Sequence, residues 1–191
     1  MRKVQAVFLD RDGVLNQKMP EGVYVTRWEQ FRILPGVPEA IARLNHAGLL
    51  VVVVSNQRGI ALGQYSAADV DAIHERFQDV LRQHNAHVDA FYMCPHDKGQ
   101  CDCRKPLTGM FDQAQRQFPA IHADRSAILG DSLSDIEFGR KLGMLTVFIE
   151  GDPARQKPGA QTAAELADLR FPSLAAAVDA LLSLLSQAQP Q

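Results

Sequence analysis

Two carboxylates, Asp10 and Asp12, lie two positions apart directly after a short apolar run. Acids this close resist sharing full ionisation unless a cation or a proton compensates their charge. Mg²⁺, which prefers hard oxygen ligands, is the natural cation for such a pair. One carboxylate could then attack phosphorus to form an aspartyl phosphate, and the other could protonate the leaving oxygen and activate water. Asp-x-Asp-Gly is also a common polar turn, so this segment alone leaves both interpretations open.

Three further segments place polar groups where an apolar run ends. Ser55 could donate a hydrogen bond to a phosphoryl oxygen, and Lys105 could neutralise charge on a transferring phosphoryl group. The guanidinium of Arg104 could bind a second anion. Asp131 could give a metal a third carboxylate, and Asp135 follows four residues later in the first turn of the next predicted helix. Each residue could instead belong to a turn, a solvated pair or a helix cap. Their joint occurrence after successive apolar runs favours one shared site.

All three cysteines of the chain fall within ten residues of one another and enclose a histidine; the set is Cys94, His96, Cys101 and Cys103. Three thiolates and one imidazole complete the tetrahedral set that structural Zn²⁺ takes. An odd cysteine count argues against a secreted disulfide framework and indicates a reducing compartment. Since no ligand position would stay open, we expect the zinc to fix the loop 94–107 and aim the two cations of that loop rather than catalyse.

Apolar runs alternate with amphipathic segments along the chain, which predicts a doubly wound α/β fold with a mostly parallel sheet. The predicted strands are 4–9, 49–54, 88–93, 126–129 and 144–149, and the predicted helices are 37–47, 67–84, 109–118, 132–142 and 174–186. Such sheets bind ligands at the carboxyl ends of their strands. The segments 14–34 and 94–107 are predicted to shape the substrate site there, and neither is long enough for a large cap domain. Residues 152–172 are predicted as a surface helix and a connector.

Composition sets the broad class of the protein. A chain of 191 residues with 46% hydrophobic residues suits one globular domain, here residues 1–191. Lys and Arg total 20 against 22 Asp and Glu, a formal charge of −2, whereas proteins that coat nucleic acid are usually strongly basic. No apolar run is long enough to span a bilayer. We therefore expect a cytoplasmic protein with neither nucleic acid nor membrane as partner.

Four segments, DRDGV, VVSNQ, RKP and GDSLSD, resemble in order the four motifs of the haloacid dehalogenase (HAD) superfamily of phosphohydrolases. The resemblance covers the chain from residue 4 to about 149 and implies a Rossmann-like fold. It implies Asp10 as the nucleophile and Asp12 as the general acid/base, with Ser55 and Lys105 stabilising the transferring phosphoryl group. It also implies Mg²⁺ held by Asp10, Asp131 and the backbone carbonyl of Asp12, with Asp135 just outside the ligand set.

The further segment CPH…CDCRKP narrows this resemblance. With it, the chain resembles the family of D-glycero-D-manno-heptose-1,7-bisphosphate 7-phosphatases and the related histidinol-phosphate phosphatases. The stretches SNQRGIALG and GVYV are similar to the heptose enzymes, so the implied substrate is a heptose bisphosphate that loses its 7-phosphate in ADP-heptose and lipopolysaccharide core biosynthesis. The implied substrate-binding residues are Tyr24, Asn56, Arg58, Arg104 and Ser132. We expect a monomer.

Histidinol phosphate, a substrate in histidine biosynthesis, is the alternative within the same chemistry. A phospho-receiver signalling module is more remote, since its acceptor carboxylate would follow the third strand, where this chain has Met93-Cys94-Pro95. A nucleic-acid binder built on the zinc loop is opposed by the charge balance.

Overall fold

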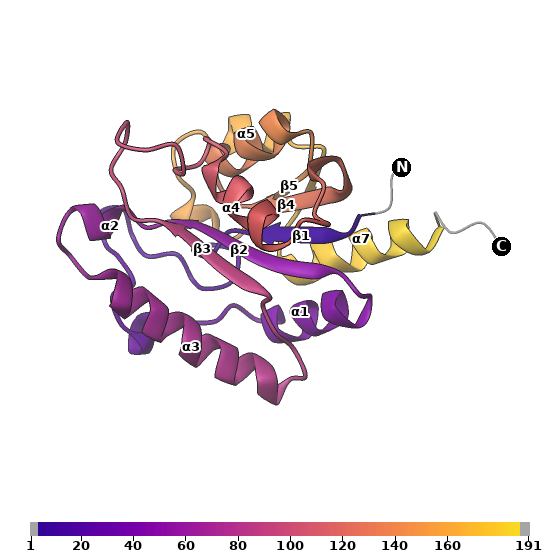
Figure 1. The fold of residues 1–191 in the computed structure, drawn as a ribbon, viewed down its shortest axis with the longest axis horizontal. Helices are drawn as coiled ribbons and strands as arrows, with labels where there is room; N and C mark the ends of the chain where they lie inside the picture. Colours follow the sequence, from indigo (N-terminus) through magenta and orange to yellow (C-terminus); the bar gives the residue numbers. More distant parts are fainter. Residues whose placement is uncertain (1–3, 188–191) are drawn as a thin grey trace.

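A six-stranded parallel sheet forms the centre of the structure, a computed structural model that describes residues 4–187 (Figure 1). The strands are β1 (Ala6–Leu9), β2 (Leu50–Asn56), β3 (Ala90–Cys94), β4 (Ser126–Gly130), β5 (Leu145–Ile149) and β6 (Leu169–Phe171). Their order across the sheet is β3-β2-β1-β4-β5-β6. The chain runs outward from β1 to one edge, returns beside β1 and runs to the other edge. This confirms the predicted doubly wound fold.

Alternate strand residues point to opposite faces of the sheet, and helices cover both. Val7 and Leu9 pack toward α1 (Val37–His46), α3 (Ala67–Gln83) and α7 (Leu174–Gln187). Ala6 and Phe8 pack toward α4 (Gly109–Gln117) and α5 (Leu133–Leu142). Figure 1 shows the two groups of helices on opposite sides of the sheet. Burial on both faces explains why the strands are continuous apolar runs rather than alternating ones.

Local signals set several helix ends. Ser66 begins α3: its hydroxyl accepts from the amide of Asp69, and the Asp69 carboxylate accepts from the Ser66 amide. Gly143 ends α5 in the left-handed conformation, with φ of 71°. Short 3-10 helices lie at Trp28–Gln30, Ala123–Arg125 and Pro153–Arg155. The start of α3 at Ser66 and the end of α5 at Gly143 are where the sequence predicts them.

Two elements differ from the prediction. The segment 152–172 was predicted as a surface helix and connector; it contains α6 (Ala160–Leu166) but also the strand β6. β6 has three residues, lies at the sheet edge and exposes Arg170, so it lacks the two-sided apolar pattern that marks the inner strands. A four-residue helix, α2 (Arg58–Ala61), follows β2 and is too short to show a helical period.

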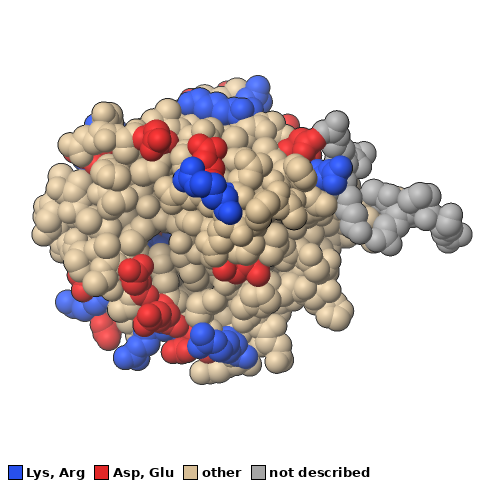
Figure 2. Space-filling model, in the orientation of Figure 1, with Lys and Arg blue, Asp and Glu red and all other residues tan. Residues whose placement is uncertain are grey.

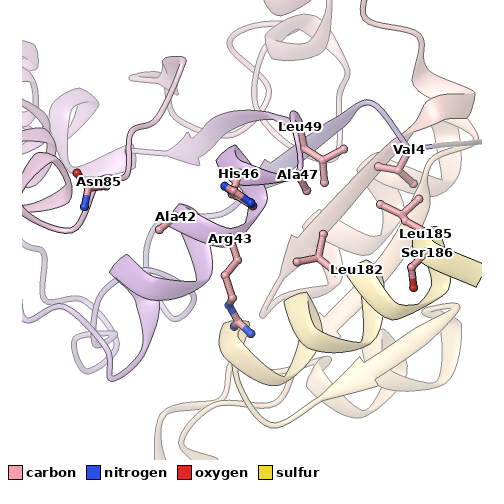
Figure 3. Close-up of a pocket in the computed structure, with 10 residues that line it drawn as sticks. All are labelled: Val4, Ala42, Arg43, His46, Ala47, Leu49, Asn85, Leu182, Leu185 and Ser186. Carbon is pink, nitrogen blue, oxygen red and sulfur yellow. The ribbon is translucent and has the colours of Figure 1, made fainter.

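The sheet brings the chemistry-bearing segments to one end. Leu9 of β1 pairs with Val53 of β2 and with Leu129 of β4, so the residues that follow emerge side by side. A pocket of about 610 Å³ lies at the other end of the strands between α1 and α7 (Figure 3). Its lining includes Val4 and Leu49, which precede β1 and β2. This pocket therefore lies at the opposite end of the sheet from the acids.

Within residues 4–187, none of the helices combines the length and apolar character needed to cross a membrane.

Candidate active site

Three buried carboxylates meet where β1 and β4 end. Asp10 follows β1 directly, and Asp131 and Asp135 lie at and just after the end of β4. One oxygen of each lies within 4.8 Å of the others. Gly13, with φ of 99°, lets the turn after β1 pass so close that a Cβ there would overlap the Asp131 side chain. The predicted convergence of these acids is confirmed.

Lys105 crosses from the Cys/His loop into the centre of this cluster and is 3% exposed. Its Nζ donates to Asp10 Oδ1 at 2.9 Å and to the Val54 carbonyl at 2.6 Å, and it pairs with Asp135 Oδ1 at 2.6 Å. Burial alone would lower the pKa of Lys105, but Asp10 and Asp135 outweigh it and raise that pKa. The side chain therefore stays an ammonium ion beside the nucleophile candidate.

The pKa values of the three acids are shifted in different directions. Burial raises the pKa of Asp10, the negative charge of Asp135 adds to this effect, and Lys105 opposes it. Burial and then Asp10 raise the pKa of Asp131 to about 7, although Lys18 opposes the shift. Burial also acts on Asp135, but Lys105 outweighs it and holds the pKa of that carboxyl low. At Asp10 and Asp131 the nearby cations do not fully compensate burial and the neighbouring carboxylates, so a further positive charge would stabilise both in their ionised forms.

Asp12 is held apart from these acids and is partly exposed. Its carboxylate accepts from Arg11 Nη2 at 2.9 Å, from Asn16 Nδ2 at 3.0 Å and from Gln57 Nε2 at 3.2 Å. Burial would raise the pKa of Asp12, but the Arg11 guanidinium and the hydrogen bonds from Asn16 and Gln57 together lower it. These contacts thus favour the ionised form of Asp12.

Ser55 shares a partner with Asp12. Gln57 Nε2 donates to Ser55 Oγ at 2.6 Å as well as to Asp12, and Gln57 Oε1 accepts from Tyr65 Oη at 2.7 Å. Burial raises the pKa of Tyr65 to about 12, so its hydroxyl remains a donor. The Tyr24 ring lies 5.8 Å from the Tyr65 ring, which places this predicted substrate residue over the same network.

Two predicted substrate-binding residues hold the backbone around the cluster. Asn56 Nδ2 donates to the Lys105 carbonyl and Asn56 Oδ1 accepts from the Lys105 amide, both at 3.0 Å. Ser132 begins α5, and its amide and hydroxyl donate to Asp135 Oδ2 at 3.1 and 2.6 Å. Asn56 therefore fixes where Lys105 enters the site, and Ser132 fixes Asp135.

The two predicted substrate arginines meet at the Cys/His loop. Arg58 Nε and Nη2 donate to the two oxygens of Asp97 at 2.6 and 3.1 Å. Arg104 Nη1 donates to the His96 carbonyl at 3.3 Å. Arg58 lies in α2, right after the Ser55–Gln57 stretch, and both guanidinium groups bind residues of the Cys/His loop.

The cysteines and histidine of that loop converge as predicted. Cys103 Sγ lies 3.4 Å from both His96 Nδ1 and Cys101 Sγ. Cys94 Sγ lies 3.5 Å from Cys101 Sγ and 3.8 Å from His96 Nδ1. Ligands bound to zinc at about 2.3 Å for sulfur and about 2.0 Å for nitrogen stand at similar separations from one another.

Comparison with known proteins places this geometry in a family. The model of the polynucleotide kinase 3 phosphatase family matches residues 5–171. The D-glycero-alpha-D-manno-heptose-1,7-bisphosphate 7-phosphatase of Mycobacterium bovis is 38% identical over 169 residues, which are 88% of this chain and 86% of that protein. The D-glycero-beta-D-manno-heptose-1,7-bisphosphate 7-phosphatase of Bordetella bronchiseptica is 40% identical over 142 residues, covering 73% of this chain and 77% of that one.

The chain belongs to the heptose-1,7-bisphosphate 7-phosphatase family. A solved structure from this family, the B. bronchiseptica D,D-heptose 1,7-bisphosphate phosphatase complexed with magnesium and phosphate, superposes with a TM-score of 0.83 at 31% identity. The superposition covers 95% of this chain and 99% of that one. The fold is thus the Rossmann-like HAD fold, and the chain is a phosphoric monoester hydrolase.

The residues of this family member fit both expected metals. Asp131 Oδ1 is buried and has no hydrogen-bond partner, in a cluster whose unbalanced charge is negative. An orphaned carboxylate oxygen beside Asp10 is what a Mg²⁺ ligand requires. The four-ligand group of Cys94, His96, Cys101 and Cys103 lies within 4.8 Å throughout and suits structural zinc.

Several residues that the structure places in this heptose-phosphatase site are not among the predicted site residues. The buried members of this group are Arg11, Asn16, Lys18, Gln57 and Tyr65. Arg11 and Gln57 lie inside the motif segments DRDGV and VVSNQ, so the motifs themselves could have indicated them. Lys18 lies in the segment 14–34, where no periodic pattern or motif marks it.

Proposed function

We propose that this protein is a magnesium-dependent phosphomonoesterase that removes the 7-phosphate of D-glycero-D-manno-heptose 1,7-bisphosphate through an aspartyl phosphate. The observation that carries the proposal is the buried Lys105, which joins Asp10 to Asp135 at the carboxyl end of the sheet. Such a cation between a nucleophile and its supporting acid is suited to a transferring phosphoryl group. The names of the relatives support the heptose bisphosphate as substrate.

In the first half-reaction, an oxygen of Asp10 forms a bond to phosphorus while the bond from phosphorus to the C7 oxygen breaks. Asp12 gives its proton to the C7 oxygen, which leaves as an alcohol. Lys105 and the Ser55 hydroxyl donate to the phosphoryl oxygens. Asp12 is ionised in the free site, so the negative phosphate must raise its pKa as the substrate enters.

In the second half-reaction, Asp12 takes a proton from a water molecule, whose oxygen attacks phosphorus. The bond between phosphorus and Asp10 breaks, which restores the carboxylate and releases inorganic phosphate. Asp12 is a carboxylate at this point because it gave its proton to the C7 oxygen in the first half-reaction. Bound Mg²⁺, held by Asp10, Asp131 and the Asp12 carbonyl, would supply positive charge that reduces repulsion between the carboxylates and the phosphate.

The far part of the substrate has candidate ligands at the site mouth. Arg58 and Arg104 supply guanidinium groups for the second phosphate, and Tyr24 supplies a ring over the Gln57 network. A bidentate guanidinium is the usual partner of such an anion. Residues of a single chain are enough to form the proposed site, and we infer a monomeric enzyme. A heptose bisphosphate is an intermediate of surface-glycan synthesis, which supports a cytoplasmic location.

Neither rival substrate is favoured by an observation of this molecule. The relatives reported above carry the heptose name rather than that of histidinol phosphate. The matching family model is named after a polynucleotide phosphatase, but a nucleic-acid substrate calls for a basic surface. On the face shown in Figure 2, Lys and Arg lie in small groups next to Asp and Glu.

The test is a phosphate-release screen at saturating Mg²⁺ that includes both anomers of heptose 1,7-bisphosphate, histidinol phosphate and a 3′-phosphorylated oligonucleotide. We expect kcat/KM for a heptose bisphosphate to exceed the other values by at least about 100-fold, or about 2.7 kcal/mol of transition-state discrimination. A preference for histidinol phosphate would overturn the substrate while leaving the chemistry in place.

The chemistry is tested with Asp10→Asn. An amide cannot form the aspartyl phosphate, so phosphate release should fall by at least about 1000-fold, while the circular dichroism spectrum is retained. Activity near that of the wild type would exclude Asp10 as the nucleophile.

A further inference from the structure

Lys18 is a buried cation that the proposed mechanism does not use. It is 7% exposed and lies in the segment 14–34, far in sequence from its partner. Its Nζ pairs with Asp131 Oδ2, and both side chains are 8% exposed. Arg155 Nη1 donates to the Lys18 carbonyl at 2.6 Å and fixes the backbone at that point. A buried lysine held in this way is a defined part of the site rather than a surface charge.

The position of Lys18 is one where two cations would compete. Asp131 Oδ2 accepts from Lys18, and Asp131 Oδ1 has no partner. The proposed function requires that Asp131 bind Mg²⁺. A carboxylate that shares its charge with a buried ammonium ion is a weaker ligand, because the metal must either break that ion pair or accept a like charge beside it.

The charges around the cluster show what this competition achieves. The three carboxylates of Asp10, Asp131 and Asp135, if ionised, face the two ammonium groups of Lys18 and Lys105, which leaves a formal charge of −1. With Mg²⁺ bound the formal charge becomes +1, which attracts a phosphate dianion. Without Lys18 the formal charge would be −2 in the metal-free cluster and 0 in the Mg²⁺-bound cluster. The first value favours binding of Mg²⁺, and the second attracts a phosphate dianion less strongly.

We propose that Lys18 is a resident counter-cation of the active site: it neutralises Asp131 in the metal-free enzyme, weakens Mg²⁺ binding, and strengthens phosphate binding once the metal is present. The inference rests on the proposed function, since it assigns Asp131 to the metal. Lys18 is a positioning and charge-balancing residue, and it does not exchange protons or form bonds with substrate.

Removing the charge of Lys18 should strengthen Mg²⁺ binding and weaken phosphate binding. A merely structural role would weaken both, so the opposite signs distinguish the two roles. Lys18→Met keeps the length of the side chain and removes the charge. In calorimetric titrations of MgCl₂ into zinc-loaded protein dialysed free of magnesium, we expect the variant to bind Mg²⁺ at least about five-fold more tightly than wild type. In titrations of inorganic phosphate at saturating Mg²⁺, we expect it to bind phosphate at least about five-fold more weakly.

Lys157 provides a matched control. It is exposed, and its positive charge also acts on Asp10, Asp131 and Asp135, but it does not pair with Asp131. Lys157→Met should change either dissociation constant by less than about two-fold, because solvent screens an exposed charge. Lys18→Arg keeps the charge, so its dissociation constants for Mg²⁺ and for phosphate should stay close to those of the wild type.

Several results would overturn the proposal. The proposal is wrong if Lys18→Met binds both Mg²⁺ and phosphate more weakly, if it leaves the Mg²⁺ affinity unchanged, or if it behaves like Lys157→Met. Each of these results would show a structural effect or a general charge effect. If its melting curve shows that Lys18→Met does not fold, the same two constants are measured on Lys18→Gln, with the same criteria. Neither titration uses the heptose substrate, so failure of the proposed substrate leaves this test intact.

Discussion

At the scale of single residues, the site depends on side chains that hold other groups in place. Asn56 is such a residue, since both its polar atoms bind the backbone of Lys105, across a sequence separation of 49 residues. The strand β2 is largely buried and pairs with both β1 and β3, so Asn56 links the loop that carries the ammonium group to the centre of the sheet. A small displacement of that group matters, because charge stabilisation depends on donors being preorganised.

Asn56→Ala removes both hydrogen bonds and should lower kcat by about 10- to 100-fold, because Lys105 is no longer fixed. Asn45→Ala is the matched control: Asn45 Oδ1 likewise accepts from a distant amide, that of His87 at 2.9 Å, but far from the acids. Both variants should lose about 1 kcal/mol of stability in urea unfolding. Equal kcat values for the two variants would show that Asn56 has no positioning role.

At the scale of elements, the Cys/His loop joins the end of β3 to the start of α4 and delivers two of the functional cations. The loop has little apolar surface of its own beyond Cys94 and Cys103, which are buried. A segment of this kind needs a metal to hold one conformation. Arg58 adds a second link, since its bidentate pair with Asp97 ties α2 to the same loop.

Zinc removal should therefore act on catalysis through the position of Lys105. We expect about one zinc ion per chain by elemental analysis, in keeping with one four-ligand site. Chelation followed by return of Mg²⁺ alone should leave kcat at least about ten-fold low and raise hydrogen exchange over residues 94–105, and added Zn²⁺ should reverse both. Protein that is purified without chelator, contains no zinc and is fully active would contradict this.

At the scale of the whole molecule, folding buries a histidine in surroundings that disfavour its charged form. His74 of α3 is 5% exposed, stacks on Phe91 at 4.3 Å, and has a buried Nε2 with no hydrogen-bond partner. Burial, and then the charge of Arg11, lowers the pKa of His74 to about 3. The unfolded chain binds a proton at the ordinary histidine value near 6.5, so between these two values the unfolded state holds more protons than the native state.

Stability should accordingly fall as the pH drops below about 6.5, by up to about 1.4 kcal/mol per pH unit from this residue. His74→Leu removes the titrating group, so urea unfolding at pH 7 and pH 5 should show about 2 kcal/mol less acid destabilisation than in wild type. The exposed His122 offers the control His122→Leu, which should follow the wild type. Parallel slopes for wild type and His74→Leu would refute the assignment.

The doubly wound sheet, the acids Asp10, Asp12 and Asp131, and the Cys/His ligand set could all be predicted from the order of the residues. These follow from local information: apolar runs mark the inner strands, and in a parallel sheet the residues after each strand must meet at one end. Ligand spacing within ten residues likewise needs no knowledge of the fold.

Three contacts became visible in the folded chain alone: Lys18 pairs with Asp131, Gln57 joins Ser55 to Asp12, and Asn56 holds Lys105. The edge strand β6 belongs with them, because its three residues become a strand only by pairing with β5. The physical reason is the same in each case: the partner lies far along the chain or across a loop without a period, and the energy of the contact exists only once the two segments are brought together.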